Sequence, residues 1–442
     1  MQRTKTPMTE GKRAVPGPLA GVRVLEITQI IAGPYCGLNL ADLGADVVKV
    51  EPPEGEGVRR VGQFAPGESK AYHTLNRGKR SLVLDLKRPE SQELIHRIIP
   101  QFDVFVMNSR AGVAGRLHLD YDTLKQYRHD LIYLESTGYG SGGPSATRAG
   151  SDIVAQAYSG LMAGEGKVDE FGAPKSVSCS AVADYATGLA AAMGVCAALY
   201  RRAVSGEGEF LQTSLLLSAL SIQAGSVAKL PVADELMRRP TLDAIEAARK
   251  RGASYDEIIG IRNNSNTIVG GAFRLYYNGY RVKDGAVILG ALTPANQQQM
   301  RRALGITDDP SASPDFNALD PAMTEQIEQL GERIRSIMLT RTMDEWIELF
   351  DREGAPISKV NLPEDLADDE QVRAMGYMSE IMHEATGPEL NVGPIVLMRQ
   401  HPTGSPLPAP VLGRHSNEVL GELGISDSEV TALRACGAVF CN

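Results

Sequence analysis

The sequence has few cysteines and no excess of basic side chains. Five cysteines among 442 residues are an odd number, and most stand in apolar contexts, which argues against a framework of disulfide bonds. The formal net charge of −9 argues against broad binding of nucleic acid or of an anionic membrane, because both require a basic surface. We therefore expect a cytoplasmic protein that binds neither. The cysteines are Cys36, Cys179, Cys196, Cys436 and Cys441.

The sequence pattern also predicts no membrane-spanning segment and no signal peptide. The uncharged stretch 189–199 is far shorter than the ~20 apolar residues of a membrane helix. Its small residues predict a helix that is packed closely on all sides. Residues 1–20 are polar and contain no apolar core of a signal peptide, so we expect no secretory signal.

Common metal and cofactor motifs are absent as well. The 7 histidines are scattered, with no HExxH motif and no paired CxxC motifs, so we predict no metal site. The stretch 136–144, "STGYGSGGP", has glycines after an expected strand but lacks the GxGxxG spacing of a dinucleotide-binding loop. It is either a tight surface turn or a ligand loop at the end of a strand.

Strand and helix patterns alternate along the chain. "GVRVLEIT" at 21–28 and "ADVVKVE" at 45–51 are typical of strands, with a helical pattern between them. This alternation predicts the α/β class, with a parallel sheet covered by helices on both faces. A chain of this length exceeds the ~250–300 residues of one core, so two domains are expected. The predicted parts are a large domain from 18–222 and 366–442, a linker or helical excursion at 223–270, and a small α/β domain at 271–365.

Positive charge is concentrated at 58–88, here called the basic segment. Runs of charge often mark a solvated face, but Gly78 would let a ligand approach the backbone closely, and lysine and arginine bind phosphates. Both interpretations, a solvated face and a site for one polyanionic ligand, stay open. The basic segment contains Arg59, Arg60, Lys70, Arg77, Lys79, Arg80, Lys87 and Arg88 against Glu68 and Asp85.

One carboxylate, Asp184, precedes the small apolar residues of "SAVADYATGLAAAMGVCAAL" at 180–199. As the N-cap of a helix it would accept hydrogen bonds from backbone N–H groups. A partly desolvated carboxylate at a helix N-terminus is also a competent nucleophile towards an activated acyl group. Position alone does not separate the cap from the nucleophile.

Taken together, these motifs resemble the class III CoA-transferases, of the CaiB/BaiF and formyl-CoA transferase type. The resemblance rests on "VLEITQIIAGPYCGLNLADLGADVVKVEPPEGEGVRR", "NRGKRSLVLDLK", "YLESTGYGSGGP" and "AVADYATGLAAAMGVCAALYRR", which follow in family order and extend over 18–438. It implies a Rossmann-like large domain, a smaller α/β domain and an interlocked homodimer. The implied substrates are an acyl-CoA and a small carboxylic acid, with no tightly bound cofactor.

The resemblance also implies residue roles. Asp184 falls on the family's catalytic aspartate, which forms an aspartyl anhydride and then an aspartyl-CoA thioester. The glycines expected to stabilise the oxyanions are Gly138, Gly140, Gly270 and Gly271, the last two in a region where relatives carry a mobile glycine loop. The residues expected at the CoA site are Lys79, Arg80, Arg116, Arg59, Arg60 and Thr137.

Departures from the family pattern bear on the substrate and the reaction. Ile31 stands where the oxalate-using branch has glutamine, and Thr137 stands where that branch has a CoA-binding lysine, so formate and oxalate are poor candidates. The racemases of the same fold use a histidine base where this chain has Ser151, and serine does not abstract a proton unassisted at neutral pH. Transfer is therefore favoured over racemisation, and over the third alternative, a non-catalytic CoA-binding protein.

Overall fold

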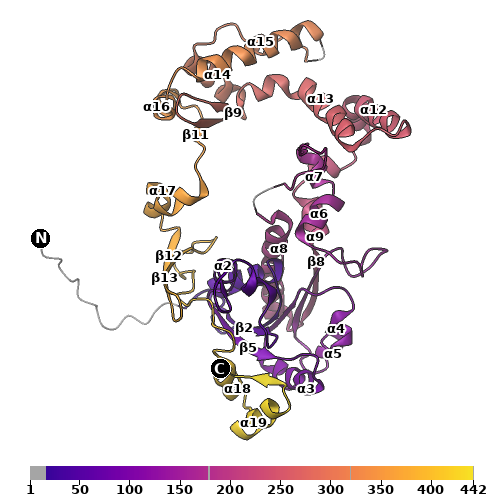
Figure 1. The fold of residues 1–442 in the computed structure, drawn as a ribbon, viewed down its shortest axis with the longest axis vertical. Helices are drawn as coiled ribbons and strands as arrows, with labels where there is room; N and C mark the ends of the chain where they lie inside the picture. The colour runs from indigo at the N-terminus through magenta and orange to yellow at the C-terminus, as the bar shows by residue number, and fades with distance from the viewer. Residues whose placement is uncertain (1–15, 178–179, 319, 442) are drawn as a thin grey trace, which may run out of the picture. The chain divides into compact units, whose positions relative to one another are not determined.

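The computed structural model describes residues 16–177, 180–318 and 320–441 (Figure 1). Contacts divide the chain into two units. The first holds the described residues up to Gly164, Ser176–Ala228 and the residues from Glu370 onwards, and the second holds Glu165–Lys175 and Lys229–Asp369. Most of the stretch 223–270, expected as a linker or excursion, therefore contributes helices to the second unit.

The first unit is built on a 7-stranded sheet with the order β14-β5-β2-β1-β6-β7-β8. All neighbouring strands in it run parallel except β14, which pairs antiparallel with β5. The strand order reverses direction between β1 and β6, and ligands of open α/β sheets bind at the carboxyl ends of strands near such a point. The strands are β1 (Arg23–Ile27), β2 (Asp46–Glu51), β5 (Lys79–Leu84), β6 (Val104–Met107), β7 (Ile132–Thr137), β8 (Glu209–Ser214) and β14 (Val439–Phe440).

Helices cover both faces of this sheet, because successive strand residues point to opposite sides. Val24 of β1 belongs to a core with α1 (Ala32–Asp42) and α8 (Val182–Ser205). Its neighbour Leu25 belongs to a second core with α3 (Pro89–Ile98), α18 (Ser416–Glu422) and α19 (Asp427–Ala435). The predicted α/β class, with a mainly parallel sheet, is confirmed.

Helix α8 packs very closely on α1. A Cβ atom added at Gly188 would lie 2.7 Å from the carbonyl oxygen of Ala32, so a larger residue would push the two helices apart. The other side of α8 is open to solvent in this chain, with Met193 71% and Tyr200 75% exposed. The prediction of close packing on all sides is therefore wrong for the single chain. Among the described residues, α8 is also the one helix whose length and composition would suffice to cross a membrane.

Shorter elements complete the first unit. They are η1 (Gly57–Arg60), β3 (Gln63–Ala65), β4 (Glu68–Ser69), α2 (Lys70–Asn76), η2 (Ile99–Gln101), α4 (Val113–Arg116), α5 (Tyr121–Leu124), α6 (Asp152–Tyr158), α7 (Leu161–Glu165, ending at the unit boundary), α9 (Leu215–Ser221), α10 (Ala224–Val227), α17 (Glu370–Ala374), β12 (Met378–His383) and β13 (Gly387–Val392). β12 and β13 form an antiparallel pair.

The second unit has a small antiparallel sheet with the order β11-β10-β9. Its core contains the single tryptophan, Trp346, with Phe350, both on α16, which opens with a capping box formed by Thr342 and Glu345. The elements are α11 (Pro231–Ala233), the π-helix η3 (Asp234–Arg238), α12 (Arg239–Lys250), α13 (Tyr255–Arg274), β9 (Tyr277–Arg281), β10 (Ala286–Gly290), α14 (Pro294–Leu304), η4 (Pro310–Ala312), α15 (Pro321–Met338), α16 (Met343–Glu353), β11 (Ile357–Lys359) and η5 (Pro363–Asp368).

Candidate active site

Asp184 lies in the first turn of α8 and is 8% exposed. It is not the cap of this helix. The Oδ1 atom of Asp152 accepts the backbone N–H groups of Ala183 and Asp184 at 2.7 and 3.1 Å, so a carboxylate from α6 caps α8. The cap interpretation of Asp184 is therefore wrong, and its own carboxyl group is left for another role.

A cavity of about 210 Å³ reaches Asp184. It lies where β1, β6 and β7 end, which is the edge of a parallel sheet at which ligands bind. The lining residues are Gln29, Ile30, Ala32, Asn108, Ser109, Arg110, Ser136, Thr137, Gly138, Gly150, Ser151, Asp184 and Leu215. A buried carboxyl group at the wall of a strand-end cavity is suitably placed to meet a substrate.

The surroundings of Asp184 favour the protonated form. Burial, and then the negative charge of Asp152, raise the pKa of Asp184 to about 7. A hydrogen bond from the backbone of Ala32, the first residue of α1, opposes this shift. Near neutral pH the group therefore exists in both forms, and its ionised form is poorly solvated and reactive.

The close approach of the chain around residues 28–33 brings Ala32 to Asp184. Ile30 has φ of 71°, a left-handed conformation that is strained for a β-branched residue. The turn is held by Asn108, whose Oδ1 accepts from the N–H of Gln29 at 2.8 Å and whose Nδ2 donates to the carbonyl of Gln29 at 2.8 Å. Gly33 is required because a Cβ there would lie 2.5 Å from Thr28.

The glycine stretch after β7 forms a turn beside the cavity. Thr137, buried at the end of β7, accepts the N–H of Gly140 on its Oγ1 atom at 2.9 Å. This N–H is therefore engaged within the turn, and Gly140 does not line the cavity. Gly138 does line it, so its role at an oxyanion stays a prediction. The stretch therefore divides: 136–138 line the cavity, and 141–144 form an exposed turn.

The second predicted glycine pair lies elsewhere. Gly270 and Gly271 fall within helix α13 of the second unit, so the expected glycine loop is a helix in this structure. Backbone N–H groups inside a helix bond to carbonyls four residues earlier and are not free to stabilise an oxyanion. The match to the family's mobile loop relied on the glycines alone, and no local signal in the sequence accounts for the helix, because the Asn, Ser, Thr, Ile and Val residues before the pair are only moderate helix formers.

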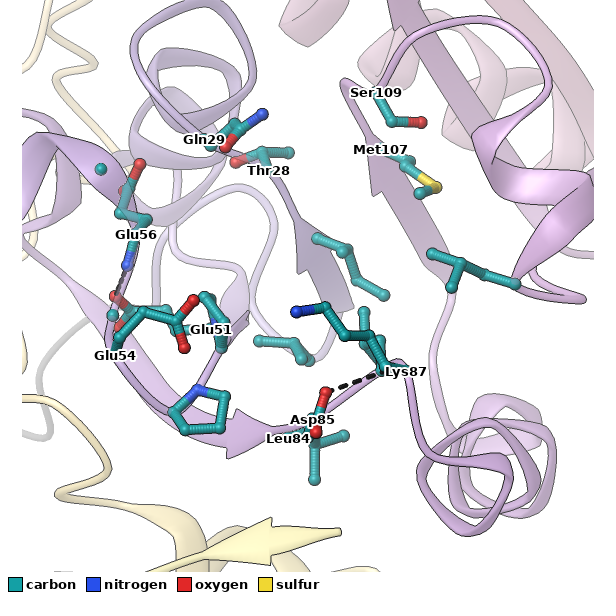
Figure 2. A pocket seen from close by; sticks show the side chains of 18 of the residues that line it. Thr28, Gln29, Glu51, Glu54, Glu56, Leu84, Asp85, Lys87, Met107 and Ser109 are labelled. Carbon is teal, nitrogen blue, oxygen red and sulfur yellow. Dashed lines mark hydrogen bonds between the residues drawn. The ribbon is translucent and has the colours of Figure 1, made fainter. Parts of the chain in front are cut away.

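A larger cavity, of about 520 Å³, lies at the carboxyl ends of β1, β2, β5 and β6 (Figure 2). Thr28, Gln29, Asn108 and Ser109 are among its lining residues, and the last three also line the cavity of Asp184. Figure 2 shows the Lys87 side chain extending over this cavity from the end of β5. The two cavities thus share a wall within the first unit.

Two of the four acidic residues that line the larger cavity, Glu51 and Glu56, form buried ion pairs, while Glu54 and Asp85 also line it. Glu51 pairs with Arg59 at 2.7 Å, and Glu56 pairs with the buried Lys49 at 3.0 Å. Lys87 and Arg60 are the basic residues among the lining side chains. The wall is therefore compatible with a negatively charged ligand.

Several residues expected at a CoA site are structural instead. Lys79 is buried, and its ammonium group donates to Glu26 at 3.0 Å and to the carbonyl of Pro34 at 2.7 Å. Arg80 donates to both oxygens of Asp46, and Arg59 is enclosed with Glu51. Lys79 and Arg80 begin β5 and so lie at the amino edge of the sheet, opposite the ligand edge.

Two other residues predicted for the CoA site, Arg60 and Arg116, lie at or next to the larger cavity, unlike Lys79, Arg80 and Arg59. Arg60 lines it, and exposed Arg116 ends α4 next to Leu117, which lines it. The sequence prediction included Lys87 only as a member of the basic segment, and it did not assign Asn108 or Asp152 to a site. Lys87 and Asn108 could have been found from their positions just after expected strands, because the carboxyl ends of parallel strands meet at one edge of the sheet.

The fold and the site define an α/β protein with a buried carboxyl group at a cavity on the carboxyl edge of its sheet. Known proteins agree with this class. Residues 19–416 match the protein-family model described as CoA-transferase family III. A crystal structure of a CAIB/BAIF family protein from Brucella suis has a TM-score of 0.70 and 27% identity, and the match covers 92% of this chain and 100% of that one.

Curated relatives are CoA-transferases. The chain is 30% identical to human succinyl-CoA:glutarate CoA-transferase over 96% of this chain and 90% of that protein. It is 31% identical to the succinate–glutarate CoA-transferase of Agrobacterium fabrum over 92% of this chain and 96% of that protein. This chain belongs to CoA-transferase family III and is an enzyme of that class, which confirms the resemblance found in its sequence.

The raised pKa of Asp184 predicts how stability depends on pH. A group with a folded pKa of about 7, against the ordinary 3.8, stabilises the folded state below pH ~4 and loses that contribution as pH rises through about 7. Asp184→Asn removes the group. The variant should therefore gain thermal stability relative to the wild type between pH 4 and 8, by at most about 4 kcal/mol.

Melting temperatures of both proteins across this pH range test the prediction. Asp427→Asn, which removes an exposed first-turn aspartate of α19, serves as the control and should show no such trend. A constant difference between Asp184→Asn and the wild type from pH 4 to 8 would contradict a raised pKa.

Proposed function

We propose that this enzyme moves CoA from an acyl-CoA donor to a carboxylic acid, with Asp184 as the covalent nucleophile. The observation that carries the proposal is the position of its carboxyl group, buried yet reached by a strand-end cavity that shares a wall with a larger one. The larger cavity would hold CoA, and the smaller one would hold the acyl group or the acid. No cofactor is needed for this chemistry.

In the first half-reaction the Asp184 carboxylate attacks the thioester carbonyl of the donor. The tetrahedral oxyanion collapses to an aspartyl anhydride and releases the CoA thiolate. The thiolate then attacks the aspartyl carbonyl, which releases the donor's acid and leaves CoA as a thioester on Asp184. The half-reaction as a whole replaces one thioester by another through a more reactive anhydride, so it is reversible.

In the second half-reaction the acceptor carboxylate attacks the aspartyl-CoA carbonyl. A new anhydride forms between Asp184 and the acceptor, and CoA thiolate is released again. This thiolate attacks the acceptor's carbonyl carbon, which yields the product acyl-CoA and restores the Asp184 carboxylate. Backbone N–H groups that stabilise such oxyanions typically contribute ~3–4 kcal/mol each, and Gly138 is the predicted donor whose position at the cavity supports that role.

Arg110 supports a dicarboxylic acid as substrate. It lines the cavity of Asp184, and a guanidinium group binds a carboxylate in a forked geometry. One carboxyl group of a dicarboxylate would react at Asp184 while the other contacts Arg110. The relatives named for succinyl-CoA and glutarate make these the first donor and acceptor to assay.

We also propose that the enzyme is a cytoplasmic homodimer, and that a second copy covers the exposed face of α8. Leu189, Met193, Tyr200 and Val204 lie on this face and are 40–75% exposed. Monomeric proteins rarely leave a continuous apolar stripe of this kind in water.

A racemase is disfavoured because Ser151, which lines the site, provides no base.

Replacing Asp184 with alanine tests the nucleophile. Asp184→Ala should lower CoA transfer from succinyl-CoA to glutarate by at least ~1000-fold, because the covalent intermediates no longer form. The product glutaryl-CoA is measured by chromatography. Asp427→Ala is the matched control and should retain wild-type activity.

An Asp184→Ala enzyme with full activity would end the proposal.

Arg110→Ala in the same assay separates the acid's binding from the chemistry. It should raise KM for glutarate while leaving a monocarboxylic acceptor less affected, and an equal loss for both acceptors would contradict the assignment of Arg110.

The position of CoA predicts which basic residues matter for its affinity. Lys87→Ala should weaken CoA binding by about 10-fold or more, since a charge-assisted contact contributes roughly 1.5–3 kcal/mol. Arg80→Ala, which changes the ion pairs at the opposite edge of the sheet, should leave the affinity of the folded enzyme unchanged. Calorimetric titration with CoA measures both, and the reverse order of effects would contradict this placement.

A further inference from the structure

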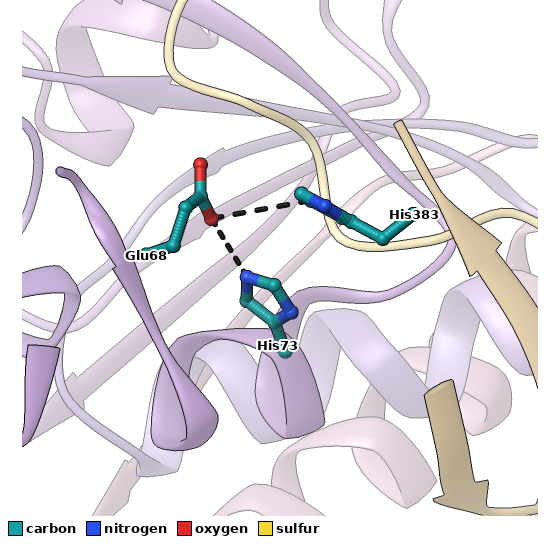
Figure 3. A group of neighbouring side chains, drawn as sticks. All are labelled: Glu68, His73 and His383. Atoms are coloured by element: carbon teal, nitrogen blue, oxygen red, sulfur yellow. Dashed lines mark hydrogen bonds and ion pairs between the residues drawn. The ribbon is translucent and has the colours of Figure 1, made fainter. Parts of the chain in front are cut away.

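A buried cluster of metal-ligand type lies apart from the residues that line the two cavities. Glu68 of β4, His73 of α2 and His383 at the end of β12 are each at most 4% exposed. One ligand atom from each lies within 4.8 Å of the others. Figure 3 shows the carboxylate of Glu68 facing both imidazole rings.

His73 is oriented by two carboxylates. Its Nε2 atom lies 2.7 Å from Oε2 of Glu68, and its Nδ1 atom lies 2.5 Å from Oε1 of Glu389. A carboxylate on the outer nitrogen of a histidine is the arrangement that fixes the ring of a metal ligand. Glu389 therefore stands where the second-layer partner of a metal-binding His73 is expected.

The far nitrogen of His383 has no hydrogen-bond partner. Its Nδ1 atom lies 2.9 Å from Oγ1 of Thr386, and that hydroxyl donates to Oε1 of Glu389 at 2.9 Å. If Nδ1 donates to the Thr386 hydroxyl, a lone pair is left on Nε2. This Nε2 atom is buried without a partner, 3.9 Å from Oε2 of Glu68, so two electron-rich atoms then face each other.

The opposite tautomer of His383 defines the competing interpretation. The backbone N–H groups of Ala385 and Thr386 approach Nδ1 at 3.3 and 3.2 Å, and if Nδ1 accepts them, Nε2 carries hydrogen towards Glu68. The cluster is then held by protons alone. The 2.9 Å contact with the Thr386 hydroxyl fits either tautomer, so a metal-binding measurement decides between them.

Charge in the cluster is also compatible with a cation. Glu68 and Glu389 bring two carboxylates, and His73 supplies at most one positive charge. Arg59 is 3.9 Å from Glu68 but is already bound to both oxygens of Glu51. A divalent cation in place of the His73 proton would balance the two carboxylates, and buried charges are stable only when they are balanced.

We propose that Glu68, His73 and His383 bind a zinc ion that fastens the β12–β13 pair to α2. Two imidazole nitrogens and one carboxylate oxygen form a donor set that Zn²⁺ accepts, with water or the second oxygen of Glu68 as the fourth ligand. The prediction of no metal site relied on short sequence spacings. It missed this cluster because His383 comes from a distant segment that returns to the first unit.

Metal binding to the full-length enzyme tests the proposal. The enzyme is treated with EDTA, dialysed and titrated with Zn²⁺ against a chromophoric chelator. We expect one Zn²⁺ per chain, a higher melting temperature with Zn²⁺, and visible absorption when Co²⁺ is used instead. Absence of stoichiometric binding by the wild type would overturn the proposal and leave the proton-only interpretation.

Variants locate the bound metal. His383→Gln should abolish stoichiometric binding, and Glu389→Gln should weaken it by about 10–100-fold, as expected for a second-layer partner. His401→Gln, at an exposed histidine, should bind like the wild type. Zn²⁺ binding that is unchanged in His383→Gln would also overturn the proposal. The wild-type titration keeps the test valid if a variant does not fold.

Discussion

The close packing of α1 on α8 determines where the carboxyl group of Asp184 lies. Gly188 allows the backbone of α1 to approach within contact distance of α8, which places Ala32 beside Asp184. Asp152 takes over the N–H groups at the start of α8. The Asp184 carboxyl group is thereby freed from capping, withdrawn from water and kept at the cavity wall. Its raised pKa is a consequence of this packing.

Buried charge has two separate functions in the first unit. Around β1, β2 and β5, Lys79 and Lys49 pair with Glu26 at 3.0 and 3.1 Å, and they tie the strands together. Removing one partner of such a pair leaves an unbalanced charge and typically costs 3–5 kcal/mol. Asp184, in contrast, has no cationic partner among the causes of its shift. This contrast distinguishes Asp184 from the carboxylates that are held in ion pairs.

The fold class could be predicted from sequence, and the structure places Asp184 at a cavity, while the surroundings of the basic residues could not be predicted. Strands such as 21–28 carry a local pattern of β-branched residues, and Asp184 stands in a long motif. The basic segment has no such local information. Whether Lys79 or Lys87 faces a ligand depends on which end of β5 each occupies and on which carboxylates return from β1 and β2. The cluster of His73 and His383 depends in the same way on contacts between distant segments.

Covalent loading of Asp184 is the central claim, and direct observation of the adduct tests it. The enzyme is mixed with succinyl-CoA, quenched in acid and digested, and the peptide that contains Asp184 is examined by mass spectrometry. The account predicts CoA attached to Asp184 as a thioester, which hydroxylamine converts to a hydroxamate. Full transfer activity with the label on another residue, or with no label at all, would contradict it.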